Sequence, residues 1–121
     1  MKFLLAEDDK TTQMSVKTFC KKSGVDIEVV GDGKQALDLC TAGNKYDVIL
    51  MDNFMPELDG MKATNLIRSL EHGSAYVIYL LSGIEDVGEE ELKKAGFDGF
   101  IKKPMNKTTF EGIVNKAKEI S

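Results

Sequence analysis

The chain has 121 residues, of which 42% are hydrophobic and 30% are charged, and its formal net charge at pH 7 is −4. This length suits a single domain with a hydrophobic core of its own, without a need for disulfides or a structural metal. The acidic balance argues against nucleic acid as the main partner, because phosphate binding requires a basic surface.

The N-terminal segment and the two cysteines predict a cytoplasmic protein that does not insert into membranes. The hydrophobic run at residues 3–6 stops at the acidic stretch "EDD" and is too short for a signal peptide. No apolar run approaches the length of a membrane span. Cys20 and Cys40 fall at apolar positions of helical patterns, which predicts reduced thiols in the core rather than a disulfide.

Residues 1–44 show two strand–helix units. The apolar run at 2–6 and the alternating run at 26–30 each predict a strand. The helical patterns that follow them end at Ser23-Gly24 and at Gly43-Asn44, which are typical helix C-termini. The apolar faces of these helices are formed by Val16, Phe19, Cys20, Ala36, Leu37 and Cys40.

Residues 45–121 continue with three more units. The predicted strands cover residues 46–51, 76–81 and 99–102, and the predicted helices cover about 59–71, about 85–95 and a last stretch with Phe110, Ile113, Val114 and Ala117 on one face. The unbroken hydrophobicity of 46–51 indicates a strand buried on both faces, as in the centre of a parallel sheet. Either Asn106 or Thr108 is expected to cap the last helix, Thr108 in a capping box with Glu111.

Five such units predict an α/β fold with three layers, in which helices cover both faces of a five-stranded parallel sheet. Binding sites in these sheets lie at the carboxyl ends of the strands. Polar residues follow four of the five predicted strands; they are Glu7, Asp8, Asp9, Asp52, Ser82, Lys102 and Lys103.

These residue types match the needs of phosphoryl transfer. Converging carboxylates repel one another unless a hard cation such as Mg²⁺ joins them. A lysine and a serine hydroxyl suit phosphoryl oxygens, and a carboxylate can itself be the nucleophile. Each residue alone has a simpler interpretation: Asp52 could be a helix cap, and the acidic run could be a solvated helix start. The coincidence at four strand ends favours a site.

Four segments carry a resemblance to a known family. "LLAEDD", "VILMDNFMPELDG", "YLLSG" and "GFDGFIKKP" occur in this order and spacing, and they resemble the signature segments of the response-regulator receiver domain, of the CheY-like superfamily. The resemblance covers residues 1–121. It implies a flavodoxin-like, CheY-like fold with strand order 2-1-3-4-5 and five helices, and a phosphorelay function in two-component signalling.

The resemblance also implies a role for each site residue. Asp52 would accept a phosphoryl group from a phosphohistidine, and Lys103 would pair with it. Asp8 and Asp52 would bind Mg²⁺ (or Mn²⁺) directly, and Glu7 would act through water. The backbone carbonyl of Phe54 would be a further metal ligand.

The switch residues are likewise implied by the resemblance. The Ser82 hydroxyl would turn toward the phosphoryl group, Phe100 would turn inward, and a cis peptide would precede Pro104. The surface formed by the fourth and fifth strand–helix units would then bind a partner. Phe54 and Ile84 are apolar at positions that affect the access of the hydrolytic water, which suggests slow dephosphorylation.

The implied protein is a phosphoacceptor switch and not an enzyme, beyond catalysing its own phosphorylation and dephosphorylation. Its partners would be a histidine kinase or histidine phosphotransfer domain and a downstream effector, and it would be a monomer or a weak phosphorylation-dependent dimer. The chain could be a stand-alone regulator or a receiver from a hybrid kinase or longer regulator.

Three alternatives remain open from the residues alone. A phosphatase of the haloacid dehalogenase type uses similar groups, but its nucleophile would fall at Glu7, which is not an aspartate. A flavodoxin-like FMN protein needs a phosphate-binding loop after the first strand, where "EDD" repels phosphate. A receiver-like interaction module that is never phosphorylated would not need the acidic set.

Overall fold

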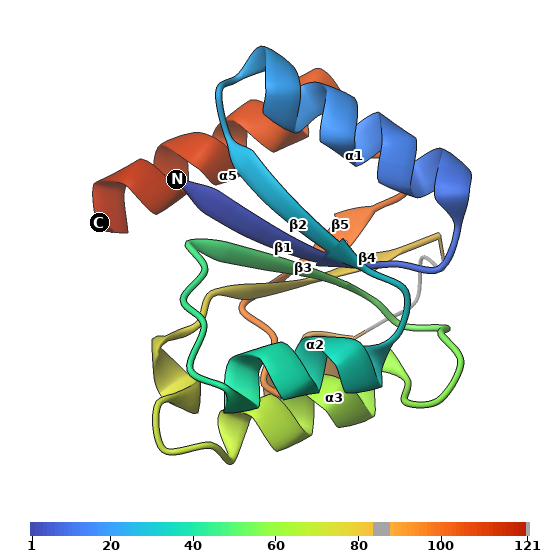
Figure 1. Cartoon of the computed structure of the whole chain (residues 1–121), viewed down its shortest axis with the longest axis vertical. Helices are drawn as coiled ribbons and strands as arrows, with labels where there is room; N and C mark the ends of the chain where they lie inside the picture. Colours follow the sequence, from blue (N-terminus) through green and yellow to red (C-terminus); the bar gives the residue numbers. More distant parts are fainter. Residues whose placement is uncertain (84–87, 121) are drawn as a thin grey trace.

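A parallel sheet of order β2-β1-β3-β4-β5 forms the centre of the computed structural model, which describes residues 1–83 and 88–120 (Figure 1). Its strands are β1 (Lys2–Ala6), β2 (Asp26–Val30), β3 (Val48–Asp52), β4 (Ile78–Ser82) and β5 (Gly99–Lys102). The helices in the described part of the chain are α1 (Lys10–Lys22), α2 (Gly33–Thr41), α3 (Gly60–Arg68), α4 (Glu89–Ala95), α5 (Lys107–Ile120) and the short 3₁₀ helix η1 (Gly73–Ala75). The predicted fold class and strand order are confirmed.

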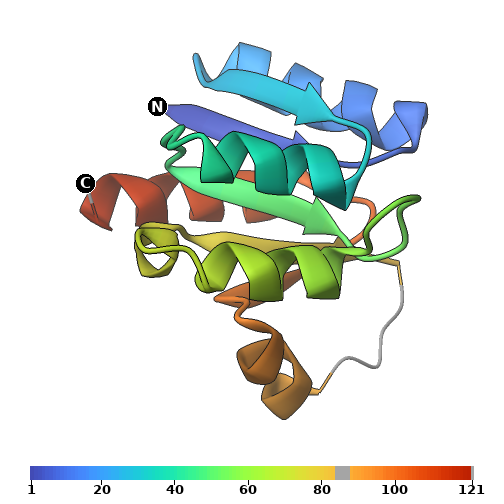
Figure 2. The same ribbon diagram turned by 60° about the horizontal axis from the view of Figure 1, so that its bottom comes forward.

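Two helical layers cover the sheet. Helices α1 and α5 lie against one face, and α2 and α3 lie against the other (Figure 1). Helix α4 lies beside α3 and belongs to the second layer, because Leu92 and Ala95 share a core cluster with Ile67 (Figure 2). Each layer therefore closes over its own hydrophobic core.

The strands supply both cores by strict alternation. In β1, Phe3 and Leu5 face the α1/α5 layer, whereas Leu4 and Ala6 face the α2–α4 layer. All five residues of β3 are buried, which confirms the predicted central strand. This alternation determines which face receives the residue that follows each strand.

Some predicted boundaries differ from the observed ones. Strand β4 begins two residues later than predicted, because the N–H of Tyr76 is used by the 3₁₀ turn and donates to Gly73. Helix α3 ends at Arg68 instead of continuing to residue 71. Asn106 caps α5, since its Oδ1 accepts the N–H of Thr109 at 2.8 Å, and the alternative capping box of Thr108 is wrong. The predicted start of α4 falls in residues 84–87, outside the described residues.

The two cysteines are free and buried, as predicted, and they lie on opposite faces of the sheet. Cys20 belongs to the core under α1 and α5, and Cys40 to the core under α2 and α3. Burial raises the pKa of the Cys20 thiol to about 11. Of the helices in the described residues, none is long and apolar enough to cross a lipid bilayer.

Candidate active site

Three charged residues continue the buried face of the sheet at the carboxyl ends of their strands. Glu7, Asp52 and Lys103 each lie two positions after a core residue that faces the α1/α5 layer. Side chains two apart on a strand point to the same face, so the three polar groups enter the same space. The parallel register, in which Ala6 pairs with Met51, brings the next residues, Glu7 and Asp52, side by side.

The Lys103 ammonium bridges the two buried carboxylates. Its Nζ donates to Glu7 Oε1 at 2.6 Å and to Asp52 Oδ1 at 3.1 Å. Glu7 is fully buried and Asp52 is 5% exposed. Burial by itself lowers the pKa of Lys103, but its hydrogen bonds to Glu7 and Asp52 outweigh that effect and raise it. The lysine therefore remains charged and neutralises one of the two acids.

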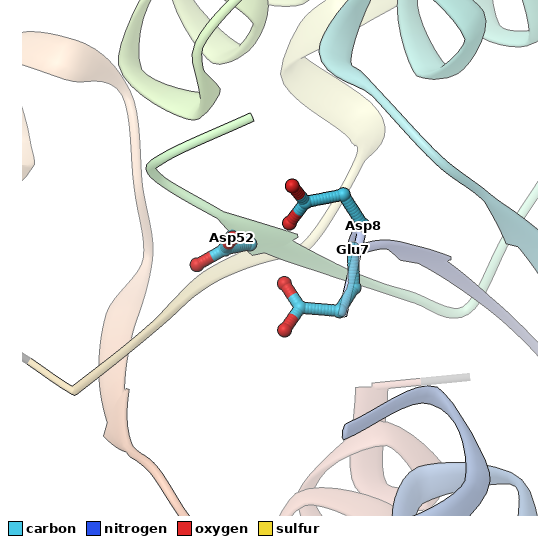
Figure 3. Close-up of side chains that lie close together, drawn as sticks. All are labelled: Glu7, Asp8 and Asp52. Atoms are coloured by element: carbon cyan, nitrogen blue, oxygen red, sulfur yellow. The ribbon is translucent and has the colours of Figure 1, made fainter. Parts of the chain in front are cut away.

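A third carboxylate leaves the site with an excess of negative charge. Oxygen atoms of Glu7, Asp8 and Asp52 lie within 4.8 Å of one another, and Asp8 is exposed (Figure 3). Burial, together with the neighbouring Asp52 carboxylate, raises the pKa of Glu7 to about 7. Glu7 Oε2 is buried and has no hydrogen-bond partner. One lysine does not satisfy three carboxylates.

This donor set fits a hard divalent cation. All three side chains offer oxygen atoms, which Mg²⁺ and Mn²⁺ prefer, and Asp8 is open to water that would complete the coordination. The unpartnered Glu7 Oε2 leaves one buried acceptor unused in this cluster. The predicted metal residues Glu7, Asp8 and Asp52 are thus brought together.

The third acid of the "EDD" run has a different task. Asp9 Oδ2 accepts the N–H of Thr12 at 3.0 Å and its hydroxyl at 2.8 Å, so Asp9 is the N-cap of α1. The side-chain amide of Gln13 donates to the backbone carbonyl of Glu7 at 2.6 Å. Nothing in the sequence distinguishes Gln13, since a polar residue in the first turns of a helix normally indicates only solvent exposure.

The loop after β3 returns the chain to the end of that strand. Gly60, the first residue of α3, approaches the strand so closely that a Cβ there would lie 2.0 Å from the carbonyl oxygen of Asp52. Only glycine fits, so α3 begins directly against the end of β3. Phe54 lies in this loop with 62% of its surface exposed. The role of its backbone carbonyl stays a prediction, and Ile84 falls outside the described residues.

The expected switch residues lie on the other face of the sheet. Ser82 ends β4 and is 2% exposed, and its carbonyl accepts the N–H of Lys103 at 2.9 Å. Phe100 of β5 is half-buried against the core under α2–α4. The Lys103–Pro104 peptide is cis, in agreement with the expectation. The backbone of Lys103 thus links Ser82 to the acidic cluster.

The chain is similar to a known family over nearly its whole length. The family model described as "Response regulator receiver domain" matches residues 3–115. The receiver domain of a sensor histidine kinase from Pseudomonas aeruginosa PAO1, solved with magnesium in its active site cleft, has a TM-score of 0.86 and 31% identity over 95% of this chain and 94% of that one. The receiver domain of a Francisella response regulator has a TM-score of 0.83 and 31% identity over 99% and 98% of the two chains.

Curated relatives include much longer proteins. Hybrid signal transduction histidine kinase I of Dictyostelium discoideum is 37% identical over 94% of this chain, and the chain spans 7% of that kinase. The autoinducer 2 sensor kinase/phosphatase LuxQ of Vibrio cholerae is 33% identical over 90% of this chain, which spans 13% of it. The similarity is therefore to one part of each kinase.

Proposed function

The chain belongs to the response regulator receiver domain family, the phosphoacceptor domains of two-component signalling, and on this basis we propose that Asp52 is its phosphorylation site. The donor would be a phosphohistidine of a histidine kinase or a histidine phosphotransfer domain. One observation carries the proposal: Asp52 is a buried carboxylate that shares a lysine with Glu7 and lies within 4.8 Å of two other acids. Such an arrangement attracts a cation, whose charge would then allow a phosphoryl group to approach, and it contributes little to the stability of the fold.

The chemical step is an in-line substitution at phosphorus. An Asp52 Oδ atom forms a P–O bond while the P–N bond to the donor imidazole breaks, and the imidazole nitrogen takes up a proton as it leaves. The Lys103 ammonium, 3.1 Å from Asp52 Oδ1, would neutralise the oxygens of the transferred group. The protein supplies position and charge, because the donor already carries a good leaving group.

Asp8 and Asp52 would hold Mg²⁺ directly, with Glu7 acting through water and the Phe54 carbonyl as a further ligand; Mn²⁺ would serve as well. When bound, the metal neutralises the charge that gathers on the phosphoryl oxygens. Glu7 contributes a fully buried carboxylate with one oxygen on Lys103 and the other unpartnered. Glu7 therefore orients the lysine and keeps an acceptor free for water.

The doubly negative phosphoryl group on Asp52 would change the conformation of the protein through Ser82 and Phe100. We propose that the Ser82 hydroxyl turns toward the phosphoryl oxygens and that Phe100, which is half-buried, moves inward and alters the α4-β5-α5 surface. A partner that prefers this surface completes the signal by shifting the population of the two states. A weak phosphorylation-dependent dimer is one form that this partner can take.

The remaining features are proposals of the same kind. The domain would catalyse only its own phosphorylation and dephosphorylation, and it would work in the cytoplasm, alone or as part of a hybrid kinase or longer regulator. Phe54, exposed and apolar beside the site, would slow hydrolysis of the aspartyl phosphate. A phosphoryl lifetime of seconds would contradict that last point.

The test is incubation with acetyl phosphate and Mg²⁺, followed by intact mass spectrometry. We expect one phosphoryl adduct per chain, no adduct in Asp52→Asn, and an unchanged adduct in the control Asp26→Asn, since Asp26 is exposed at the opposite end of the sheet. No adduct under any condition, or an adduct that persists in Asp52→Asn, would contradict the proposal. Turnover of p-nitrophenyl phosphate without an adduct would favour the phosphatase alternative.

A further inference from the structure

The loop between β1 and α1 contains three residues, and each carries a negative side chain. Glu7 faces the buried lysine, Asp8 faces solvent and the other acids, and Asp9 caps α1. Three mutually repelling carboxylates in succession would drive this loop apart if only the fold's hydrophobic contacts held it. The loop therefore needs specific restraints on its backbone.

Two hydrogen bonds restrain the backbone of Glu7. Its N–H donates to the carbonyl of Val30 at 3.0 Å, which extends the pairing of β1 with β2 by one residue. Its carbonyl accepts from the side-chain amide of Gln13 at 2.6 Å. Strand β2 ends at Val30, so a helix side chain provides the second bond where the strand neighbour has ended.

The peptide between Glu7 and Asp8 decides where both carboxylates point. In a regular strand, successive side chains point to opposite faces. Here the carboxylates of Glu7 and Asp8 both approach Asp52 (Figure 3). The chain must leave strand geometry at this peptide, and the Gln13 amide holds the carbonyl of that peptide.

We infer that Gln13 is a positioning residue for the cation site: by holding the Glu7 carbonyl, it fixes the distance between the Glu7 and Asp8 carboxylates and so favours a small octahedral cation over a larger one. This inference rests on the metal site of the proposed function and goes beyond it. Gln13 is half-buried, and its backbone N–H makes the ordinary helical bond to the carbonyl of Asp9 at 3.0 Å, which does not depend on the side chain. The first turn of α1 therefore holds the side-chain amide beside the acidic loop.

Mg²⁺ and Ca²⁺ respond differently to a loosened site. Mg²⁺ requires near-ideal octahedral geometry at short distances, whereas Ca²⁺ accepts variable geometry and more ligands. Loss of an outer residue that orients ligands typically weakens metal binding about 10- to 100-fold. A loop that lost the Gln13 bond would therefore lose Mg²⁺ affinity first.

The test compares Gln13→Met, which keeps the length of the side chain but has no N–H donor, with Asn44→Leu. Asn44 is a matched control because its side-chain amide also donates to a backbone carbonyl, that of Leu39 at 2.9 Å, and because it lies between α2 and β3, at the end of the sheet opposite the acidic cluster. Calorimetric titration with Mg²⁺ and Ca²⁺ gives the dissociation constants. We expect Gln13→Met to raise that for Mg²⁺ about tenfold and that for Ca²⁺ less than about threefold, and Asn44→Leu to change neither.

Two results would overturn the inference: Mg²⁺ affinity in Gln13→Met within twofold of the unmodified chain, or equal weakening of both ions, which a merely structural role would produce. Circular dichroism before each titration verifies that the variant is folded. Failure of the proposed function would look different, because the unmodified chain would then take no phosphoryl group from acetyl phosphate. We expect Gln13→Met to accept that group once Mg²⁺ is raised to saturation.

Discussion

The two ends of the sheet differ in how well their positive and negative side chains are balanced. At the carboxyl ends of the strands, Lys103 pairs with two members of a cluster of three carboxylates, and an oxygen of Glu7 is left without a hydrogen-bond partner. At the amino ends, one guanidinium, Arg68, faces one carboxylate, Asp98, at 2.8 Å. The first arrangement is unsatisfied and the second is matched.

Arg68 joins several segments near the amino ends of β4 and β5. Its Nε donates to the carbonyl of Gly96 at 2.8 Å, and its Nη1 donates to those of Gly73 and Tyr76 at 2.7 and 2.6 Å. The side chain joins the end of α3 to η1, to the segment before β4 and to the segment before β5. Because the guanidinium fork is rigid, these bonds fix the segments relative to one another.

The contrast between the Arg68 network and the acidic cluster distinguishes charges that stabilise the fold from charges that are available for binding. A charged network in which every polar group has a partner adds rigidity, whereas one with surplus charge reduces stability until a ligand binds. The same sheet thus has one end where the charges are matched and another with surplus negative charge, where the proposed function places a cation and a phosphoryl group. Substitutions that remove a charge at the two ends should therefore change the free energy of unfolding in opposite directions.

The largest effect is expected at the amino end. Arg68→Met removes a donor from three backbone carbonyls, of which, among the described residues, only that of Gly73 keeps another, the N–H of Tyr76. It should lower the free energy of unfolding by about 3 kcal/mol, as measured by urea denaturation. Mg²⁺ affinity should stay unchanged. The control Lys107→Met breaks an exposed ion pair with Glu111 and should cost under about 0.5 kcal/mol. A loss below 1 kcal/mol in Arg68→Met would remove the contrast between the two ends.

The next effect is expected at Glu7, with the opposite sign. Its pKa in the folded chain is raised from 4.5 to about 7, so its stabilising contribution is full below pH 4.5 and is lost as the pH rises through 7. In metal-free protein, Glu7→Gln should therefore be more stable than the unmodified chain by roughly 2 kcal/mol at pH 8, and the difference should vanish near pH 4. Urea denaturation in EDTA at several pH values measures it. A difference that is independent of pH would contradict the surplus charge.

The smallest effect is expected at Asp8, which is exposed. Without metal, Asp8→Asn should raise the free energy of unfolding by about 0.5 kcal/mol, because solvent and salt screen its repulsion. With saturating Mg²⁺, the unmodified chain should become the more stable of the two, since binding stabilises only the folded state. Melting curves in EDTA and in Mg²⁺ give both values. The same order of stability in both buffers would show that Asp8 does not bind the cation.

Much of the fold was predictable from the alternation of apolar residues. Strands 2–6, 26–30 and 99–102 agree with the observed bounds, since charged or turn residues mark their ends. The two strands predicted to start at Tyr46 and Tyr76 begin two residues later. A tyrosine has the same apolar signature whether it lies in a strand or packs beside it, and here the Tyr46 hydroxyl bonds Glu28 from outside the strand.

The composition of the site was predictable, but the division of tasks within it was not. Glu7, Asp52 and Lys103 share a face because each lies two residues after a core position, which is a signal present in the sequence. Asp8 and Asp9 are identical residues, and only the start of α1 decides which one becomes the cap. Gln13 and Arg68 left no signal, because polar residues on a helix normally face water and their partners here come from other segments.

The two cysteines allow the opening of each helical layer to be measured separately. Cys20 lies under one helical layer and Cys40 under the other, and both thiols are buried with raised pKa values. A thiol reagent in solution reaches each sulfur only when the layer above it opens. The labelling rates of the two single-cysteine variants would therefore report separately on the opening of the two sides of the sheet. Phosphorylation that loosens the α2–α4 side alone would then raise the labelling rate of Cys40 and leave that of Cys20 unchanged.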